Sequence, residues 1–256
     1  MGGRVNALRV IEHQGVVEIE LCRPAERNAI NTEMISELHA VCGDLEQDPR
    51  PAIITGGSDG VFAGGADIAQ LRERGRDDAL AGINLKLFDR IRALPMPTIA
   101  AVDGYALGGG AELTYACDLR IATPRAVFGQ PEPRLGIIAG AGATYRLVRL
   151  LGESVAKHIL LAGERITAQR ALELGLVHSI VEPTELISAA HQLAANMLRN
   201  SAIALRMSKL AIDAAPAAHP QIDLVIQAML FEDAEKYRRM DEFLNKSAKT
   251  EGANRT

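Results

Sequence analysis

Residues 104–113 read GYALGGGAEL, in which three consecutive glycines are followed by an alanine and by Glu112. Glycine is a poor residue with which to build a helix, because it loses much backbone freedom on folding. Burying a carboxylate among apolar neighbours is also costly. Taken alone, the stretch is explained by a turn and a first-turn helix acid that complements the helix dipole. A functional explanation needs a chemistry that uses bare backbone and an acid in one place.

Two further stretches combine glycines with an acid. FAGGADI (62–68) carries Asp67, and FGQPEPRLGIIAGAGATYRL (128–147) carries Glu132. Taken alone, Asp67 is explained as a helix N-cap after a turn, and Glu132 as a loop acid held beside two prolines. The joint occurrence of the three stretches, in this order and spacing, favours a shared functional site instead.

Composition predicts a globular protein. The chain has 256 residues, of which 48% are apolar and 23% charged, enough for one large core. The net charge of -4 gives no broad basic surface for nucleic acid. No apolar run approaches the roughly 18 residues that span a bilayer, and MGGRVNALRV at the N-terminus does not resemble a secretory signal. Three scattered cysteines favour neither a disulfide framework nor a zinc site. We therefore expect a cytoplasmic protein that binds neither nucleic acid nor membrane.

Strand and helix patterns alternate through the first 150 residues, which indicates an α/β class. LRVIEH (8–13) and VVEIEL (16–21) predict a hairpin. A helix capped by Asn31 or Thr32 should follow, and a second helix is expected over 80–94, where prolines end it. Further strand patterns are AIITGG (52–57), TIAAV (98–102) and, about a proline turn, RIATPRAVFG (120–129).

Helical patterns dominate from about residue 150 onward, and beyond Asn200 no other pattern remains. There is no internal sequence repeat and no low-complexity linker. The last 60 or so residues are too few to bury a core of their own, so they should pack on the core or on another subunit. We expect a core domain over 1–195 and a helical region over 196–256.

The usual catalytic motifs are missing. The six histidines include no H-E-x-x-H and no pair at metal-ligand spacing. G-x-S-x-G is absent, which argues against a nucleophile elbow. GGGAEL lacks the Lys-Ser/Thr of a phosphate loop and does not fit G-x-G-x-x-G. The glycine-rich stretches therefore give only weak support to a nucleotide-binding site.

The sequence resembles the crotonase superfamily, the enoyl-CoA hydratase/isomerase family, over essentially its whole length. The pairing of FAGGADI with GYALGGGAEL at this separation is highly specific for that family. The resemblance implies a crotonase-like spiral of ββα units with a helical C-terminal trimerisation region. It also implies an acyl-CoA thioester substrate, no cofactor other than the coenzyme A of the substrate, and a homotrimer or a dimer of trimers. The other matching stretches are LCRPAERNAIN (21–31), CDLRIAT (117–123), FGQPEPRLGIIAGAGATYRL and AQRALELGLVHSIV (168–181).

The family's reactions share an enolate formed at the thioester carbonyl, which backbone N–H groups can stabilise if no side chain blocks them. The resemblance assigns these two donors to Ala66 and Gly109. It assigns the two acids to Glu112, which we expect to activate water, and Glu132, which we expect to deliver a proton. Members that only shift a double bond commonly lack the acid matching Glu112, so the presence of both favours hydration.

Substrate contacts are expected by the same resemblance. Tyr145 is open to two explanations, plain packing or narrowing of the acyl pocket, and the charged stretch over 69–82 is expected to be a solvated loop. The expected contacts are Arg23, Ala25, Arg27, Ala63, Ala66, Asp67, Ile68, Gly109, Pro131, Gly140 and, from a neighbouring subunit, Phe243 and Lys246.

The leading hypothesis is an enoyl-CoA hydratase. An enoyl-CoA isomerase, or another crotonase-family reaction, is the nearest alternative. A non-catalytic acyl-CoA-binding protein is an alternative of a different class, although a pure binder has no reason to bury two acids.

Overall fold

The N-terminal hairpin begins the larger of two β-sheets. In the computed structural model, which describes residues 7–253 (for 246–253 only the helical backbone), β1 (Leu8–His13) pairs antiparallel with β2 (Val16–Leu21). The two residues between them both have positive φ, 49° and 77°, as a tight two-residue hairpin turn requires. The predicted hairpin is confirmed.

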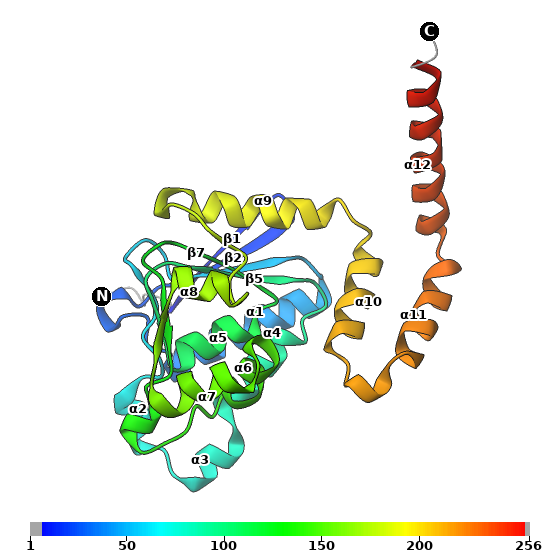
Figure 1. Ribbon diagram of the computed structural model, residues 1–256. Helices are drawn as coiled ribbons and strands as arrows, with labels where there is room; N and C mark the ends of the chain where they lie inside the picture. Colours follow the sequence, from blue (N-terminus) through cyan, green and yellow to red (C-terminus); the bar gives the residue numbers. More distant parts are fainter. Residues whose placement is uncertain (1–6, 254–256) are drawn as a thin grey trace. The chain divides into compact units, whose positions relative to one another are not determined.

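The larger sheet has six strands in the order β1-β2-β3-β5-β7-β10, and every pairing after the hairpin is parallel. All residues of β3 and β5 are buried, as expected for central strands covered on both faces. Figure 1 shows α1, α4 and α5 on one side of this sheet and α9 on the other. The strands that complete it are β3 (Ala52–Thr55), β5 (Thr98–Val102), β7 (Leu119–Ala122) and β10 (Ser179–Ile180).

The smaller sheet has the order β4-β6-β8-β9, with only the last pair antiparallel. Three successive strand pairs, β3/β4, β5/β6 and β7/β8, each give one strand to each sheet and are each followed by helix. This is the expected spiral of ββα units. The four strands of the smaller sheet have only three residues each: β4 (Val61–Ala63), β6 (Tyr105–Leu107), β8 (Val127–Gly129) and β9 (Arg165–Thr167).

Helix α1 (Thr32–Gln47) begins where the sequence predicts it. The Asn31 side chain accepts the Met34 N–H at 2.9 Å, and the helix buries one apolar face that includes Ile35, Leu38, Cys42 and Leu45. The single helix expected over 80–94 is wrong at its start. Gly82 adopts a φ of 62° and separates α3 (Arg76–Ala81) from α4 (Ile83–Arg92).

The stretch over 69–82 is helical, which corrects the expectation of a solvated loop. Asp67 caps α2 (Ile68–Glu73) by accepting the Gln70 N–H at 3.2 Å, and α3 follows after Gly75. Short helices in this stretch have too few residues for an apolar periodicity to be visible. The other helices of this part are α5 (Gly109–Ala116), α6 (Ala143–Leu151), α7 (Glu153–Ala162), α8 (Ala168–Glu173), α9 (Leu186–Leu198) and the 3-10 turns η1 (Pro24–Glu26), η2 (Glu132–Leu135) and η3 (Pro183–Glu185).

The described residues divide between Asn196 and Met197 into two compact units, and the second is entirely helical. Within it, the Ser201 hydroxyl donates to Glu235 at 2.7 Å and so ties the start of α10 to α12. No helix in residues 7–253 is both long and apolar enough to cross a membrane. The elements of this unit are α10 (Ala202–Asp213), η4 (Pro216–Ala218), α11 (Gln221–Phe231) and α12 (Ala234–Ala253).

Candidate active site

Two of the three consecutive glycines are required by close approach of other groups. Gly108 has a φ of 52°, and an added Cβ would lie 2.6 Å from Oε1 of Glu132. Gly110 lies in the first turn of α5, where an added Cβ would lie 2.3 Å from the carbonyl oxygen of Ala63 at the end of β4. A side chain at either position would therefore separate the segments that form the site.

The middle glycine faces a free backbone donor across open space. A Cβ added to Gly109 would lie 3.5 Å from the Ala66 nitrogen. Ile30 pairs with Ala66 as a parallel bridge, in which Ile30 donates to Gly65 and accepts from Asp67, so the Ala66 N–H points away from it. Gly109 is the first residue of α5, and its N–H has no partner within the helix. No acceptor among residues 7–253 takes either N–H.

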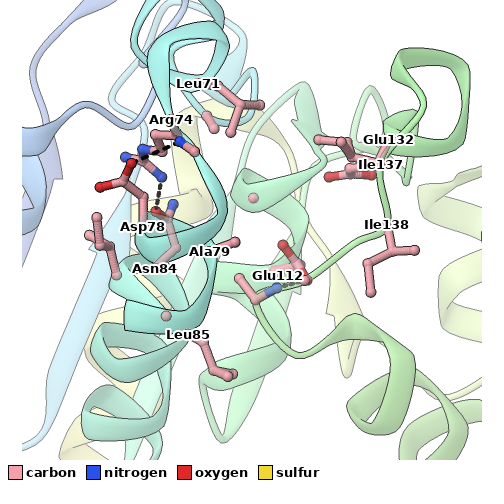
Figure 2. Close-up of a pocket in the computed structure, with 17 residues that line it drawn as sticks. Leu71, Arg74, Asp78, Ala79, Asn84, Leu85, Glu112, Glu132, Ile137 and Ile138 are labelled. Carbon is pink, nitrogen blue, oxygen red and sulfur yellow. Dashed lines mark hydrogen bonds between the residues drawn. The ribbon is translucent and has the colours of Figure 1, made fainter.

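Ala66 and Gly109 border a cavity of about 550 Å³. Figure 2 shows Glu112 and Glu132 beside it, together with Ile137 and Ile138 of the loop that follows η2. Five of the residues expected to form the site border this one cavity. They are Ala66, Gly109, Glu112, Glu132 and Gly140.

Glu112 is held by backbone donors on one side of its carboxylate. Only 3% of the residue is exposed, and its Oε1 accepts the N–H groups of Ala141 at 2.8 Å and Ala143 at 3.0 Å. Its other oxygen accepts no hydrogen bond from the described residues. Burial raises the pKa of Glu112, and the two N–H groups and the charge of Arg146 oppose that rise by favouring the ionised form.

Glu132 begins η2 and is a more easily protonated acid. Burial, and to a smaller extent the negative charge of Glu112, raises its pKa from 4.5 to about 7. When the Gln130 amide is oriented with its nitrogen toward the carboxyl, it donates to the two Glu132 oxygens at 3.2 and 2.9 Å. The two carboxyls therefore have different electrostatic environments: the charge of Arg146 opposes the rise in the pKa of Glu112, whereas the charge of Glu112 adds to the rise in the pKa of Glu132.

The loop that holds Glu112 is itself held by Arg146, which the sequence analysis missed. The Arg146 side chain is 4% exposed, donates to the Ala141 carbonyl at 2.8 Å and pairs with Asp89 on α4. Gly142 adopts a φ of 118°, at which a side chain would be strained, and an added Cβ would also lie 2.0 Å from Nη1 of Arg146. Tyr145 neither lines the cavity nor packs in the core; it is half-exposed and donates to Asp89 at 2.9 Å.

A polar pair in the opposite wall was missed as well. Nη1 of Arg74, which follows α2, donates to Oδ1 of Asn84 on α4 at 3.0 Å, and both residues line the cavity. The sequence offered one signal for Arg146. It lies three residues after Ala143 and directly before Leu147, on the face of α6 that is buried, where a charged residue is unusual. The sequence offered none for Arg74, which lies among other charged residues in the stretch expected to be a loop.

The segment expected to contact coenzyme A is built around Asn28. This residue is 1% exposed with a φ of 53°, and its side-chain oxygen accepts the Arg23 N–H at 2.8 Å. Its amide donates to the carbonyls of three residues of the β3–β4 connection and β4, which ties the segment to the sheets. Those residues are Gly56, Val61 and Phe62. Arg23 also lies 3.5 Å from Asp67, so two of the expected substrate contacts touch each other, while Arg27 is exposed.

The remaining expected contacts lie outside the cavity lining and stay predictions. Ala25 is exposed on η1, Ala63 is buried against Gly110, Ile68 is exposed at the start of α2 and Pro131 is partly buried before Glu132. Phe243 is exposed on α12 in the second unit, and the side chain of Lys246 lies outside the described residues.

No group of three or more His, Cys, Asp or Glu side chains in residues 7–253 is arranged to hold a metal ion. The polar groups that border this cavity are the carboxyls of Glu112, Glu132 and Asp78, the two free backbone N–H groups, and the side chains of Arg74 and Asn84.

Comparison with known proteins gives consistent matches over most of the chain. The family model described as "Enoyl-CoA hydratase/isomerase" matches residues 12–250. A short-chain-enoyl-CoA hydratase of Clostridium acetobutylicum is 40% identical over 211 residues, 80% of each chain. A 2,3-dehydroadipyl-CoA hydratase of Escherichia coli is 38% identical over 231 residues, 89% of each chain. The crystal structure of an enoyl-CoA hydratase from Bacillus anthracis superposes with a TM-score of 0.88 at 31% identity, covering 94% of this chain and 96% of that one.

Proposed function

The chain belongs to the enoyl-CoA hydratase/isomerase family, and we propose that within this family it adds water across the 2,3 double bond of a 2-enoyl-CoA thioester. The observation that carries the proposal is the pair of buried carboxyls, Glu112 and Glu132, bordering the same cavity as two free backbone donors. A double-bond shift needs one group to move a proton, whereas hydration needs both a base for water and an acid for carbon.

The N–H groups of Ala66 and Gly109 receive the thioester oxygen as it becomes an enolate oxygen. Gly109 begins α5, so the positive end of the helix dipole adds to this stabilisation. Removing one donor of this kind typically costs about 2.7–4 kcal/mol in the barrier. Glu112 lies three residues further along the same helix, less than one turn away, so the base and the oxyanion donor are positioned by one rigid element.

Ionised Glu112 orients a water molecule and takes its proton as the oxygen attacks C3. The backbone donors of Ala141 and Ala143 occupy one carboxylate oxygen and leave the other for that water. Protonated Glu132 delivers its proton to C2 as the enolate collapses. Its pKa of about 7 keeps a large fraction protonated near neutral pH, which suits a general acid.

Coenzyme A enters as part of the substrate. We place its recognition at the segment of Arg23, Ala25 and Arg27, with Asp67 and Ile68 at the start of α2, and we assign Phe243 and Lys246 to the neighbouring subunit of a homotrimer or a dimer of trimers. The apolar side chains that α11 exposes, among them Leu224, Val225 and Met229, support such an assembly. Light scattering should give a mass that is a multiple of three chains.

The experiment that tests the proposal offers the purified protein crotonyl-CoA and longer 2-enoyl-CoAs and follows the loss of absorbance of the conjugated thioester. A 3-enoyl-CoA, tested in parallel, reports isomerase activity. Turnover of a 2-enoyl-CoA that falls at least about 100-fold in both Glu112→Gln and Glu132→Gln supports the proposal. Binding of acyl-CoA without turnover of either substrate would instead identify a non-catalytic binding protein.

A further inference from the structure

Arg74 lines the cavity across from the two glutamates. It follows α2, its backbone N–H bonds to Leu71, and its side chain runs along the wall formed by α2, α3 and α4. Figure 2 shows Arg74 grouped with Asn84 and Asp78 on this wall, on the opposite side of the view from Glu132, and all four residues line the cavity. The rest of the lining is largely apolar, with leucine, isoleucine, alanine and glycine residues.

Arg74 forms no ion pair in the part of the chain that the structure describes. Its guanidinium makes one hydrogen bond, to the neutral Asn84, and no carboxylate among the described side chains, residues 7–245, forms an ion pair with it. Asp78 is its acidic neighbour, but that carboxylate accepts the Gly75 N–H at 2.8 Å. Arginine has five N–H donors, so most of the donor capacity of Arg74 is open to a ligand.

The Arg74–Asn84 pair lies near the reacting end of the substrate. A Cβ added to Gly109 would lie 3.9 Å from Nδ2 of Asn84, so the asparagine adjoins the oxyanion donor and the guanidinium lies one amide beyond it. A group bound by Arg74 is then separated from the thioester by only a few carbons. Filling this space with hydrocarbon alone would desolvate an unpaired cation, which is costly.

We propose that Arg74 recognises an anionic group at the far end of the acyl chain, so that the preferred substrates are 2-enoyl-CoAs of modest length that end in a carboxylate. This inference rests on the proposed hydratase function. A planar guanidinium fork matches a carboxylate through two parallel hydrogen bonds. Asn84 orients the fork from behind by holding Nη1.

The test compares kcat/KM for two 2-enoyl-CoAs of equal length, one ending in a carboxylate and one in the neutral primary amide. The wild type should favour the carboxylate about 10- to 100-fold, the usual worth of hydrogen bonds to a charged group. Arg74→Met should remove this preference and leave turnover of the amide and of crotonyl-CoA within about threefold. Arg72→Met, which removes an exposed arginine of α2 outside the cavity lining, is the matched control and should keep the preference.

Two outcomes would overturn the inference. A wild type that does not distinguish the two substrates has no anion-recognising group in the cavity. If kcat/KM of the Arg74→Met variant falls equally for both substrates, Arg74 contributes to binding of the coenzyme or to the fold and does not recognise the carboxylate. Arg74→Lys retains the positive charge without the planar guanidinium, so it should keep only part of the preference for the carboxylate substrate. This variant also provides a test if Arg74→Met does not fold.

Failure of the inference and failure of the hydratase function give different results. If the protein hydrates crotonyl-CoA but shows no preference for a carboxylate substrate, the proposed hydratase function stands and the proposed role of Arg74 is wrong. If no 2-enoyl-CoA is hydrated, the proposed hydratase function is wrong. The role of Arg74 can then still be tested by calorimetry, which compares the Kd values of saturated acyl-CoAs that end in a carboxylate or in an amide. Equal Kd values in the wild type would then overturn the inference as well.

Discussion

Gly110→Ala should disable the site while changing only one methyl group. The added Cβ would lie 2.3 Å from the Ala63 carbonyl oxygen and 2.7 Å from the Ala63 Cβ. Contacts of a Cβ with backbone are essentially never shorter than 3.0 Å, so β4 and α5 must separate by about 0.7 Å or more. These are the segments that lead to Ala66 and begin with Gly109, so the two proposed oxyanion donors must move relative to each other.

The magnitude follows from this displacement. A misplacement of about 1 Å in a reacting geometry can cost on the order of 100-fold in rate, and loss of one oxyanion donor costs about 100- to 1,000-fold. We expect kcat for 2-enoyl-CoA hydration to fall about 100-fold in Gly110→Ala, with a smaller change in KM. Overpacking should also lower the free energy of unfolding by about 1–3 kcal/mol, an effect measured by urea titration.

Gly43→Ala is the matched control. Gly43 lies within α1, and a Cβ there would meet only the end of the Arg90 side chain, at 3.4 Å. Replacing a helical glycine by alanine in open space should stabilise by about 0.5–1 kcal/mol and leave kcat unchanged. If Gly110→Ala keeps kcat within threefold of the wild type, close contact between β4 and α5 does not set the oxyanion geometry, and the reasoning is refuted.

Glu132→Gln should stabilise the protein while abolishing most hydration. The folded-state pKa of Glu132 is raised to about 7, so its ionisation destabilises the fold by up to roughly 3 kcal/mol at pH 8 and not at all below pH 4.5. Urea unfolding should therefore show the gain at pH 8 and almost none at pH 4; equal changes at both would contradict the assignment. In the wild type, kcat/KM should decline above about pH 7, as Glu132 loses the proton that we propose it delivers. Arg146→Met removes a charge that favours ionised Glu112 and the bond to Ala141, so the acidic limb of kcat/KM should move to higher pH. Tyr145→Phe, which loses only the hydroxyl bound to Asp89, should leave that limb in place, and an unshifted limb in Arg146→Met would exclude this role.

Local signals in the sequence predicted the elements that are long or that are bounded by clear turn and capping residues. The hairpin of β1 and β2, the Asn31 cap of α1 and the central strands β3 and β5 follow from alternation, capping chemistry and buried runs. The structural explanation of Asp67 is also confirmed, since its side chain caps α2. These features depend on neighbours within a few residues, which a single sequence displays directly.

The smaller sheet could not be predicted in this way. Strands of three residues have too few positions to display a period of two. They exist because β4, β6, β8 and β9 pair with one another across the fold. The ββα repeat is for the same reason absent from the sequence as a repeat, since it consists of pairings and not of recurring residues.

The sequence by itself determined the α/β class and the family, and it predicted the residues that we propose for the site: the glycines of GYALGGGAEL, the pair Ala66 and Gly109, and the acids Glu112 and Glu132. Only the tertiary structure decided what each one meets. Gly108 makes room for Glu132, Gly110 makes room for β4, and Glu112 finds its donors in a loop held by Arg146. It also decided that Arg74 lines the cavity without an acidic partner. Motifs record which groups a chemistry needs, whereas distance, burial and the pairing of charge arise only when segments distant in sequence fold against each other.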